Sequence, residues 1–94
     1  MEDLILALKK FCADIIEKQH LTPPVHIELT DVGMNPMYEM DAGKNDEGTY
    51  VFSNEWFIEG TLSRPTPYRV RFTVAGKKPF VKDFPLSQNE SNHA

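Results

Sequence analysis

The spacing of apolar residues changes along the chain, from a helical period near the N-terminus to a two-residue alternation further on. In the N-terminal part, spacings of three and four place the apolar residues on one stripe of a helix: Leu4, Leu8, Phe11, Cys12 and Ile15. This pattern predicts an amphipathic helix over about residues 3–19. The dipeptide Pro23-Pro24 then prevents the helix from continuing, because neither proline can donate a backbone hydrogen bond.

The alternating part of the chain predicts four or five strands that are separated by turn residues. The expected strands cover residues 25–30, 34–40, 50–62, 68–75 and 80–84. Pro36 interrupts the second of these and favours an edge position or a later start. Asn54 interrupts the apolar face of the third strand and indicates a β-bulge.

A helix followed by strands with short connections predicts an α+β fold. We expect one N-terminal amphipathic helix packed on a four- to five-stranded antiparallel meander sheet. A chain of 94 residues can close one hydrophobic core, so residues 1–86 are expected to form a single α+β domain. The polar tail at residues 87–94 is expected to be disordered.

The charged residues are distributed unevenly, although the net charge of the whole chain is only −4. Residues 28–59 include eight acidic side chains and one basic one, whereas residues 60–86 include six basic side chains and one acidic one. A hairpin whose turn lies at residues 63–67 would place Glu59 opposite Arg71 and Trp56 opposite Val74. We therefore expect two neighbouring strands to neutralise each other's charges.

The same hairpin predicts which side chains of the third strand face the core. Trp56 is expected to pack against the helix, whereas Phe57 is expected to point outward. On that outer side, Phe57 with Val51 and Met37 would form an apolar patch of the kind that binds a protein partner. Acidic residues near the patch favour a basic partner. The expected partner-binding residues are Phe57, Met37, Val51, Glu55, Asp41, Asp46 and Glu47.

Metal-ligand patterns are weak in this sequence. His26 and Glu28 share one face of the first strand, but His20 lies across the proline pair and no HxxxH or HExxH spacing is present. The acidic loop at residues 41–48 lacks the regular ligand alternation and the final glutamate of a calcium loop. We therefore expect no metal site and no cofactor.

Catalytic and nucleic-acid-binding patterns are weak as well. Cys12 lies in the apolar stripe of the helix, where a thiol is usually an unreactive small hydrophobic group. The five glycines are dispersed and none opens the helix, so there is no phosphate-binding loop. Basic residues near Tyr68 and Phe72 alternate with core-facing aromatics, and the chain has an acidic pI of about 5.2. We expect neither an enzyme nor a nucleic-acid partner.

The N-terminus gives an expectation about location. Its apolar run begins with acidic residues, whereas an export signal begins with basic ones. Cys12 is the only cysteine and cannot form an internal disulfide, which is typical of a reducing compartment. The sequence therefore predicts a cytoplasmic protein without a membrane partner.

These features favour a small acidic intracellular protein-binding module that acts by surface occlusion, without catalysis. An inhibitor, an immunity-type protein, a phage-encoded protein or another accessory protein would fit this description, and a homodimer is compatible with the same patch. The alternative is a small-molecule-binding or enzymatic domain that uses a cleft between helix and sheet. Met34, Met37 and Met40 would then form an adaptable apolar wall of that cleft.

Overall fold

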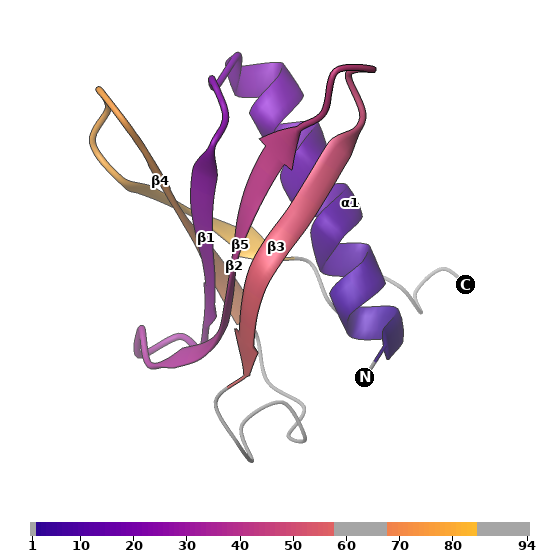
Figure 1. Cartoon of the computed structure of the whole chain (residues 1–94). Helices are drawn as coiled ribbons and strands as arrows, with labels where there is room; N and C mark the ends of the chain where they lie inside the picture. The colour runs from indigo at the N-terminus through magenta and orange to yellow at the C-terminus, as the bar shows by residue number, and fades with distance from the viewer. Residues whose placement is uncertain (1, 58–67, 85–94) are drawn as a thin grey trace, which may run out of the picture.

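A computed structural model describes residues 2–57 and 68–84 of the chain. Helix α1 (Glu2–Gln19) precedes five strands: β1 (Val25–Thr30), β2 (Pro36–Lys44), β3 (Tyr50–Phe57), β4 (Tyr68–Val74) and β5 (Phe80–Phe84). The strands form an antiparallel sheet in the order β3-β2-β1-β4-β5, and α1 lies across one face of it (Figure 1). The expected α+β fold, with one helix packed on an antiparallel sheet, is therefore confirmed.

Helix α1 ends in a Schellman motif at His20. The amide of Leu21 donates to the carbonyl of Ile16 at 3.0 Å, and the amide of His20 donates to the carbonyl of Glu17 at 3.2 Å. His20 has a φ of 55°, the left-handed conformation that this motif requires after the helix. Ile16 and Leu21 are both buried, so the motif also turns the chain toward the core.

The hydrophobic core lies between α1 and the face of the sheet that α1 covers. Side chains with no exposed area come from the helix and from three strands: Leu8, Cys12, Val25, Ile27, Leu29, Met40, Ala42, Val70 and Phe72. Phe72 of β4 stacks on Phe80 of β5, with ring centroids 5.1 Å apart. Full burial of one large apolar side chain contributes about 1.5–3 kcal/mol, so these residues dominate the stability of the fold.

Strand β4 lies beside β1 and not beside β3, so the expected hairpin between β3 and β4 is wrong. Arg71 of β4 is opposite Glu28 of β1, and Arg71 Nη1 lies 3.8 Å from Glu28 Oε1. The negative charge that was expected opposite Arg71 is therefore supplied by β1 and not by β3. Glu59 and the turn at residues 63–67 lie outside the described residues, as does the tail at residues 87–94.

Burial explains why β4 and not β3 lies next to β1. Alternate residues of β4 are all buried, namely Tyr68, Val70, Phe72 and Val74. Such a strand is best covered inside the sheet, where a neighbouring strand flanks it on each side. No residue of β3 is buried, and β3 forms an edge of the sheet. Cross-strand pairs contribute only about 0.2–1 kcal/mol each, which is less than the burial of one large apolar side chain.

A β-bulge in β3 changes the face to which its last residues point. Ser53 pairs with Asp41 and Trp56 pairs with Glu39, so Asn54 and Glu55 together stand opposite a single residue of β2. Asn54 has a φ of 55°, as the first residue of such a bulge often does. The bulge predicted at Asn54 is confirmed, and its extra residue moves every later side chain of β3 to the opposite face.

The expected orientations of Trp56 and Phe57 are therefore reversed. Trp56 does not pack in the core: its side chain is 60% exposed, on the face of the sheet away from α1. Phe57 turns to the helix side, opposite Tyr38, and the two ring centroids are 4.7 Å apart. We call the sheet face that carries Trp56 and Glu39 the outer face.

Candidate functional site

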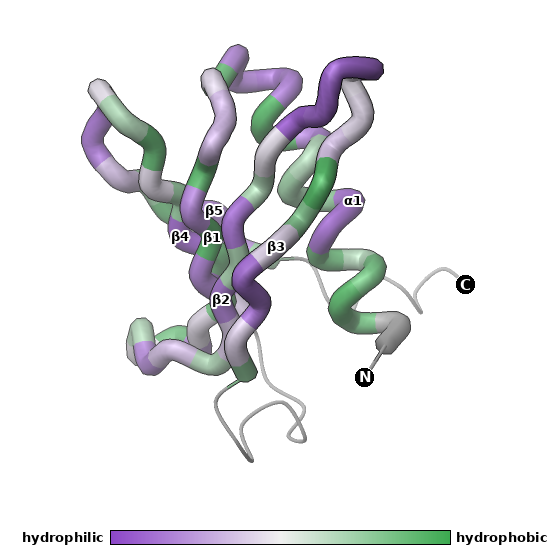
Figure 2. The backbone as a smooth tube through the Cα atoms, in the orientation of Figure 1, coloured by the Kyte–Doolittle hydropathy of each residue, from purple (hydrophilic) through white to green (hydrophobic). Residues whose placement is uncertain are grey.

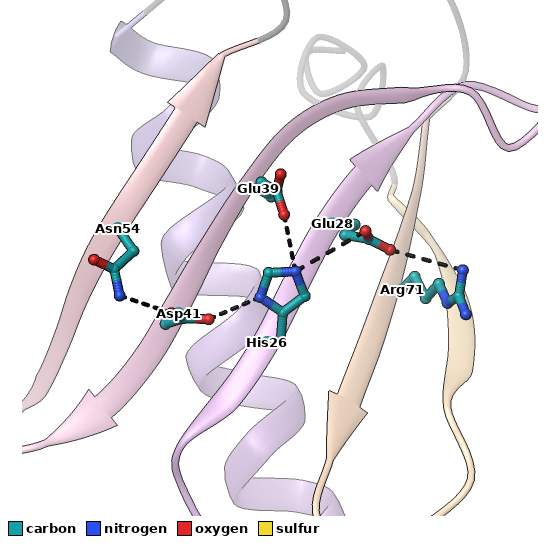
Figure 3. A network of polar contacts seen from close by, with 6 residues as sticks. All are labelled: His26, Glu28, Glu39, Asp41, Asn54 and Arg71. Atoms are coloured by element: carbon teal, nitrogen blue, oxygen red, sulfur yellow. Dashed lines mark hydrogen bonds and ion pairs between the residues drawn. The ribbon is translucent and has the colours of Figure 1, made fainter.

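Four ionisable side chains meet on the outer face of the sheet, opposite the face that α1 covers (Figure 3). His26 and Glu28 come from β1, and Glu39 and Asp41 come from β2. Antiparallel pairing places His26 opposite Asp41 and Glu28 opposite Glu39, so the four side chains occupy two adjacent rows. We call these four residues the His26 cluster.

The imidazole of His26 contacts carboxylates through both of its nitrogens. Nδ1 lies 2.7 Å from Asp41 Oδ1, and Nε2 lies 2.9 Å from Glu39 Oε1 and 3.9 Å from Glu28 Oε2. Asn54 Nδ2 donates a hydrogen bond of 2.8 Å to the second carboxylate oxygen of Asp41. The bulge of β3 thus holds Asp41, and Asp41 in turn holds the imidazole.

These contacts change the pKa values within the cluster. Partial burial alone would lower the pKa of His26, but the hydrogen bond to Asp41 and the charges of the three carboxylates together raise it above the ordinary histidine value. The pKa of Asp41 is lowered, first by its hydrogen bond with His26 and then by the one from Asn54. The cluster therefore stabilises a positive charge at its centre.

The cluster also contains the donor atoms that divalent transition metals prefer, an imidazole nitrogen and carboxylate oxygens. His26, Glu28 and Glu39 each offer one ligand atom, and these three atoms lie within 4.8 Å of one another. Their side chains are 28–40% exposed, so ions from solvent can reach them. The sequence pattern of His20, His26 and Glu28 does not include Glu39, which the second strand brings to the same place.

The sequence carries part of the signal for the two residues of β2. A hairpin that turns at residues 31–35 pairs positions at equal distances from the turn. For this turn the rule would place Met40 opposite His26, but an irregularity between Leu29 and Thr30 shifts the register by one residue. Asp41 is therefore opposite His26, and Glu39 is opposite Glu28. The alternation of β2 then assigns both carboxylates to the face of His26.

The predicted apolar patch of Phe57, Val51 and Met37 is not formed. Met37 belongs to the core and is only 2% exposed, and Phe57 lies on the helix side of β3. Val51 keeps the predicted outward orientation and is 48% exposed. The exposed apolar side chains that β3 presents on the outer face are therefore Val51 and Trp56.

Three acidic residues that the sequence predicts as partner-binding, Asp41, Asp46 and Glu47, fall in two places. Asp41 belongs to the His26 cluster, whereas Asp46 and Glu47 are exposed in the hydrophilic turn between β2 and β3 (Figure 2). Lys44 precedes this turn, but its Nζ lies 3.1 Å from Glu17 Oε2 of α1. The lysine charge is therefore balanced by the helix, and the acids of the turn keep a local excess of negative charge.

Glu55, the remaining predicted site residue, lies on the helix side of the sheet. It accepts a hydrogen bond from the hydroxyl of Tyr38, and its Oε2 lies 3.3 Å from Lys9 Nζ. The hydrogen bond from Tyr38 is the main cause that lowers the pKa of Glu55; partial burial opposes the shift and Lys9 reinforces it. Glu55 thus links β3 to β2 and to α1, which is a structural role that the sequence pattern did not predict.

An open depression of about 440 Å³ lies beside the His26 cluster, over β2 and β3. Its lining includes Gly43, Val51, Ser53 and Asn54. Gly43 pairs with Val51, and because glycine has no side chain the outer face is recessed at this point. A Cβ atom at Gly43 would come no closer than 3.9 Å to the nearest atom found, the backbone oxygen of Val51. The site would therefore accept a side chain without a clash.

The alternative interpretation placed Met34, Met37 and Met40 along a cleft between helix and sheet, and their positions do not agree with it. Met37 and Met40 are buried within the core. Met34 lies in the turn between β1 and β2, where its Sδ lies 3.7 Å from the donating hydroxyl of Thr30. Two of these methionines therefore fill the core and the third packs within a turn.

Cys12 has the environment expected of an unreactive thiol. Its side chain has no exposed area and lies in the core below the sheet. Burial raises the pKa of the Cys12 thiol, so the thiolate that would be needed for nucleophilic attack is disfavoured.

Comparisons with protein-family models, with curated proteins and with solved structures find no match to this chain. Within residues 2–57 and 68–84, no helix is both long enough and apolar enough to cross a membrane. What the protein binds is therefore inferred from the outer face itself.

Proposed function

We propose that the protein is a binding module that holds an extended basic segment of a partner protein on the outer face of its sheet, along β3. Trp56 supplies the apolar anchor, and the carboxylates of β2 supply the complementary charge. The observation that carries this proposal is the 60% exposure of Trp56 directly beside Glu39. The proposal includes no catalytic step.

The apolar part of the argument starts from Trp56 and Val51, which both point outward from β3. Tryptophan is enriched among the residues that dominate binding energy at protein interfaces. An extended segment can add to an edge strand through backbone hydrogen bonds, while its alternate side chains enter neighbouring hollows. The depression over Gly43 lies within reach of a side chain from such a segment.

The electrostatic part of the argument concerns β2 and the turn that follows it. Glu39 and Asp41 lie on the outer face, where His26 offsets at most one of the charges of its three carboxylate neighbours. Asp46 and Glu47 are exposed in the turn. Lys44, the basic residue within this stretch, is engaged with α1. Lysine or arginine side chains of a partner would therefore meet negative charge, which steers association and provides specificity.

Trp56 gives a direct measurement, because it is the only tryptophan of the chain. Short synthetic peptides with lysine alternating with valine would be titrated into the protein, alongside peptides in which glutamate replaces each lysine. We expect the lysine peptide to shift the Trp56 emission to shorter wavelength and to bind more tightly than the glutamate peptide. We also expect its affinity to fall as the salt concentration rises, because salt screens exposed charges.

Two variants address the two parts of the surface. Gly43→Leu fills the depression and should weaken peptide binding without disturbing the fold. Trp56→Ser, measured by calorimetry, should weaken binding by about 30-fold or more, as expected for a central interface tryptophan. Ala75→Leu is the control for Gly43→Leu: it also introduces a leucine, but at an exposed position after β4, and should leave binding unchanged.

Equal affinity for the lysine and glutamate peptides would contradict the proposal, as would unchanged binding by Gly43→Leu. Light scattering tests a different occupant of the same face. A dimer that dissociates in Trp56→Ser would show that a second copy of the chain occupies the outer face, and it would overturn the assignment to a basic segment.

A further inference from the structure

We propose that the His26 cluster binds a divalent transition-metal ion such as Zn²⁺. In this assignment Nε2 of His26 and one carboxylate oxygen each from Glu28 and Glu39 are the ligands, and Asp41 is the residue that positions the imidazole. The inference does not depend on the proposed protein partner, because the metal alone can test it.

The three ligand atoms lie within 4.8 Å of one another, and the two distances from His26 are close to those around a small tetrahedral ion. Ligands placed about 2.0–2.2 Å from such an ion are separated from one another by about 3.3–3.6 Å. Nε2 of His26 lies 2.9 Å from Glu39 Oε1 and 3.9 Å from Glu28 Oε2, so the required separation falls between the two observed distances. Small rotations of the two glutamate side chains, on strands whose backbones are fixed by pairing, would complete the geometry.

The orientation of the imidazole is already set for metal binding. Metal-binding histidines generally donate the N–H of the second ring nitrogen to a carboxylate or carbonyl oxygen. In this protein Nδ1 lies 2.7 Å from Asp41 Oδ1, which directs Nε2 toward Glu28 and Glu39. Asn54 holds the other oxygen of Asp41 at 2.8 Å (Figure 3).

The charge of the cluster also fits a divalent cation. Metal binding requires the neutral imidazole, so His26 would release its proton. Three carboxylates then surround it, and Arg71 lies 3.8 Å from Glu28, so an excess of two negative charges remains. An imidazole ligand favours zinc, copper, nickel or cobalt over calcium or magnesium, which prefer oxygen ligands alone. Three protein ligands leave a fourth position for water or for a donor from another molecule.

A competing explanation for the same contacts is a purely structural ion-pair network. In that case a protonated His26 would neutralise the surrounding carboxylates, and the cluster would have no selective affinity for transition metals. The two explanations differ in a measurable way, because only the metal site predicts saturable binding of one ion per chain.

The tag-free protein would be titrated with ZnCl₂ and with CoCl₂ in a buffer that does not chelate metals. We expect one ion to bind per chain, with a visible Co²⁺ absorption of a site that contains a nitrogen ligand. We also expect Co²⁺ to quench the emission of Trp56, because the backbone of Trp56 pairs with that of Glu39. CaCl₂ should produce neither effect.

Variants then identify the ligands. His26→Gln should abolish the saturable binding, and Asp41→Asn should weaken it about 10- to 100-fold, as is typical when the partner of a ligating histidine is changed. His20→Gln, at an exposed position after α1, is the matched control and should bind like the wild type.

Saturable binding that persists in His26→Gln, or a wild-type chain that binds no Co²⁺, would overturn the proposal. If His26→Gln failed to fold, the NMR signals of the wild-type imidazoles would decide the question. Co²⁺ should shift or broaden the ring signals of His26 and leave those of His20 unchanged, and the opposite result would likewise overturn the assignment.

Discussion

Asp41 Oδ1 lies 2.7 Å from His26 Nδ1, so a residue of β2 determines which nitrogen of a β1 imidazole faces the other carboxylates of the outer face. Asn54, in the bulge of β3, holds the second oxygen of Asp41. The same bulge turns Trp56 to the outer face. One irregularity in an edge strand therefore positions both features on which the two proposals depend.

The bulge gives the first prediction, which concerns Asn54. This residue has a φ of 55°, a conformation that costs an alanine about 1–2 kcal/mol but costs a glycine almost nothing. Asn54→Ala should therefore lower the free energy of unfolding by about 1–2 kcal/mol, through strain and the lost hydrogen bond to Asp41. Asn54→Gly loses only the hydrogen bond and should be the more stable of the two variants. Urea unfolding measures the free energy of unfolding of both variants. An alanine variant as stable as the glycine variant would contradict the prediction.

The corrected position of Trp56 gives the second prediction. Trp56→Ala should change the free energy of unfolding by no more than about 0.5 kcal/mol, because the side chain is mostly exposed. Phe72→Ala should lower it by about 3–5 kcal/mol, because Phe72 is fully buried and stacks on Phe80. Chemical denaturation followed by circular dichroism compares the two variants without relying on tryptophan emission. A large loss in Trp56→Ala would mean that the ring packs in the core after all.

The elements of this fold could be predicted from the sequence because periodicity directly reports which faces are buried. The stripe of α1 and the alternation of β1 and β4 are continuous, and these three predicted elements agree with the observed ones to within one residue at each end. The second strand differs: β2 continues to Lys44, four residues beyond the predicted end, into residues that were expected to form a loop. Charge alone does not predict which strand lies beside β4, because Glu28 of β1 suits Arg71 as well as a glutamate of β3 would. Pair energies of a few tenths of a kcal/mol do not determine strand order when core burial contributes far more.

The candidate site was only partly visible in the sequence, for a related reason. Asn54 indicated a bulge, but the face of Trp56 depends on where the extra residue enters the pairing, and a shift of one residue reverses every later side chain. The alternation of residues 25–30 places His26 and Glu28 on one face. Their two partners in β2 come opposite them through a one-residue register irregularity near the turn, which neither a short ligand motif nor the length of the turn predicts.

The third prediction concerns acid pH and Glu55. Its folded-state pKa is lowered, mainly by the hydrogen bond from Tyr38, against an unfolded value of about 4.3. Glu55 therefore contributes fully to stability at pH values above its unfolded-state pKa. This contribution is lost as the pH falls through its lowered folded-state pKa. The difference in unfolding free energy between the wild type and Glu55→Gln should shrink from neutral pH to about pH 3. The carboxylate is partly exposed, so solvent screening keeps the effect modest.

Urea titrations of both proteins at several pH values measure this difference. Glu47→Gln, in the exposed turn between β2 and β3, serves as the control for the removal of one carboxylate away from Tyr38. A difference between the wild type and Glu55→Gln that stays constant over the whole range would show that the contact with Tyr38 does not depend on the carboxylate charge.

The fourth prediction concerns the end of α1, where His20 occupies the left-handed position of the Schellman motif with a φ of 55°. Glycine adopts this conformation without the steric cost that a Cβ atom imposes, although it loses more backbone entropy on folding. His20→Gly should therefore raise the free energy of unfolding by about 0.5–1 kcal/mol. Gln19→Gly, one residue earlier and still helical, should lower it by a similar amount, because glycine is unfavourable within a helix. Thermal unfolding of the two variants should therefore shift in opposite directions, and a loss of stability in His20→Gly would mean that contacts of the imidazole outweigh the backbone strain.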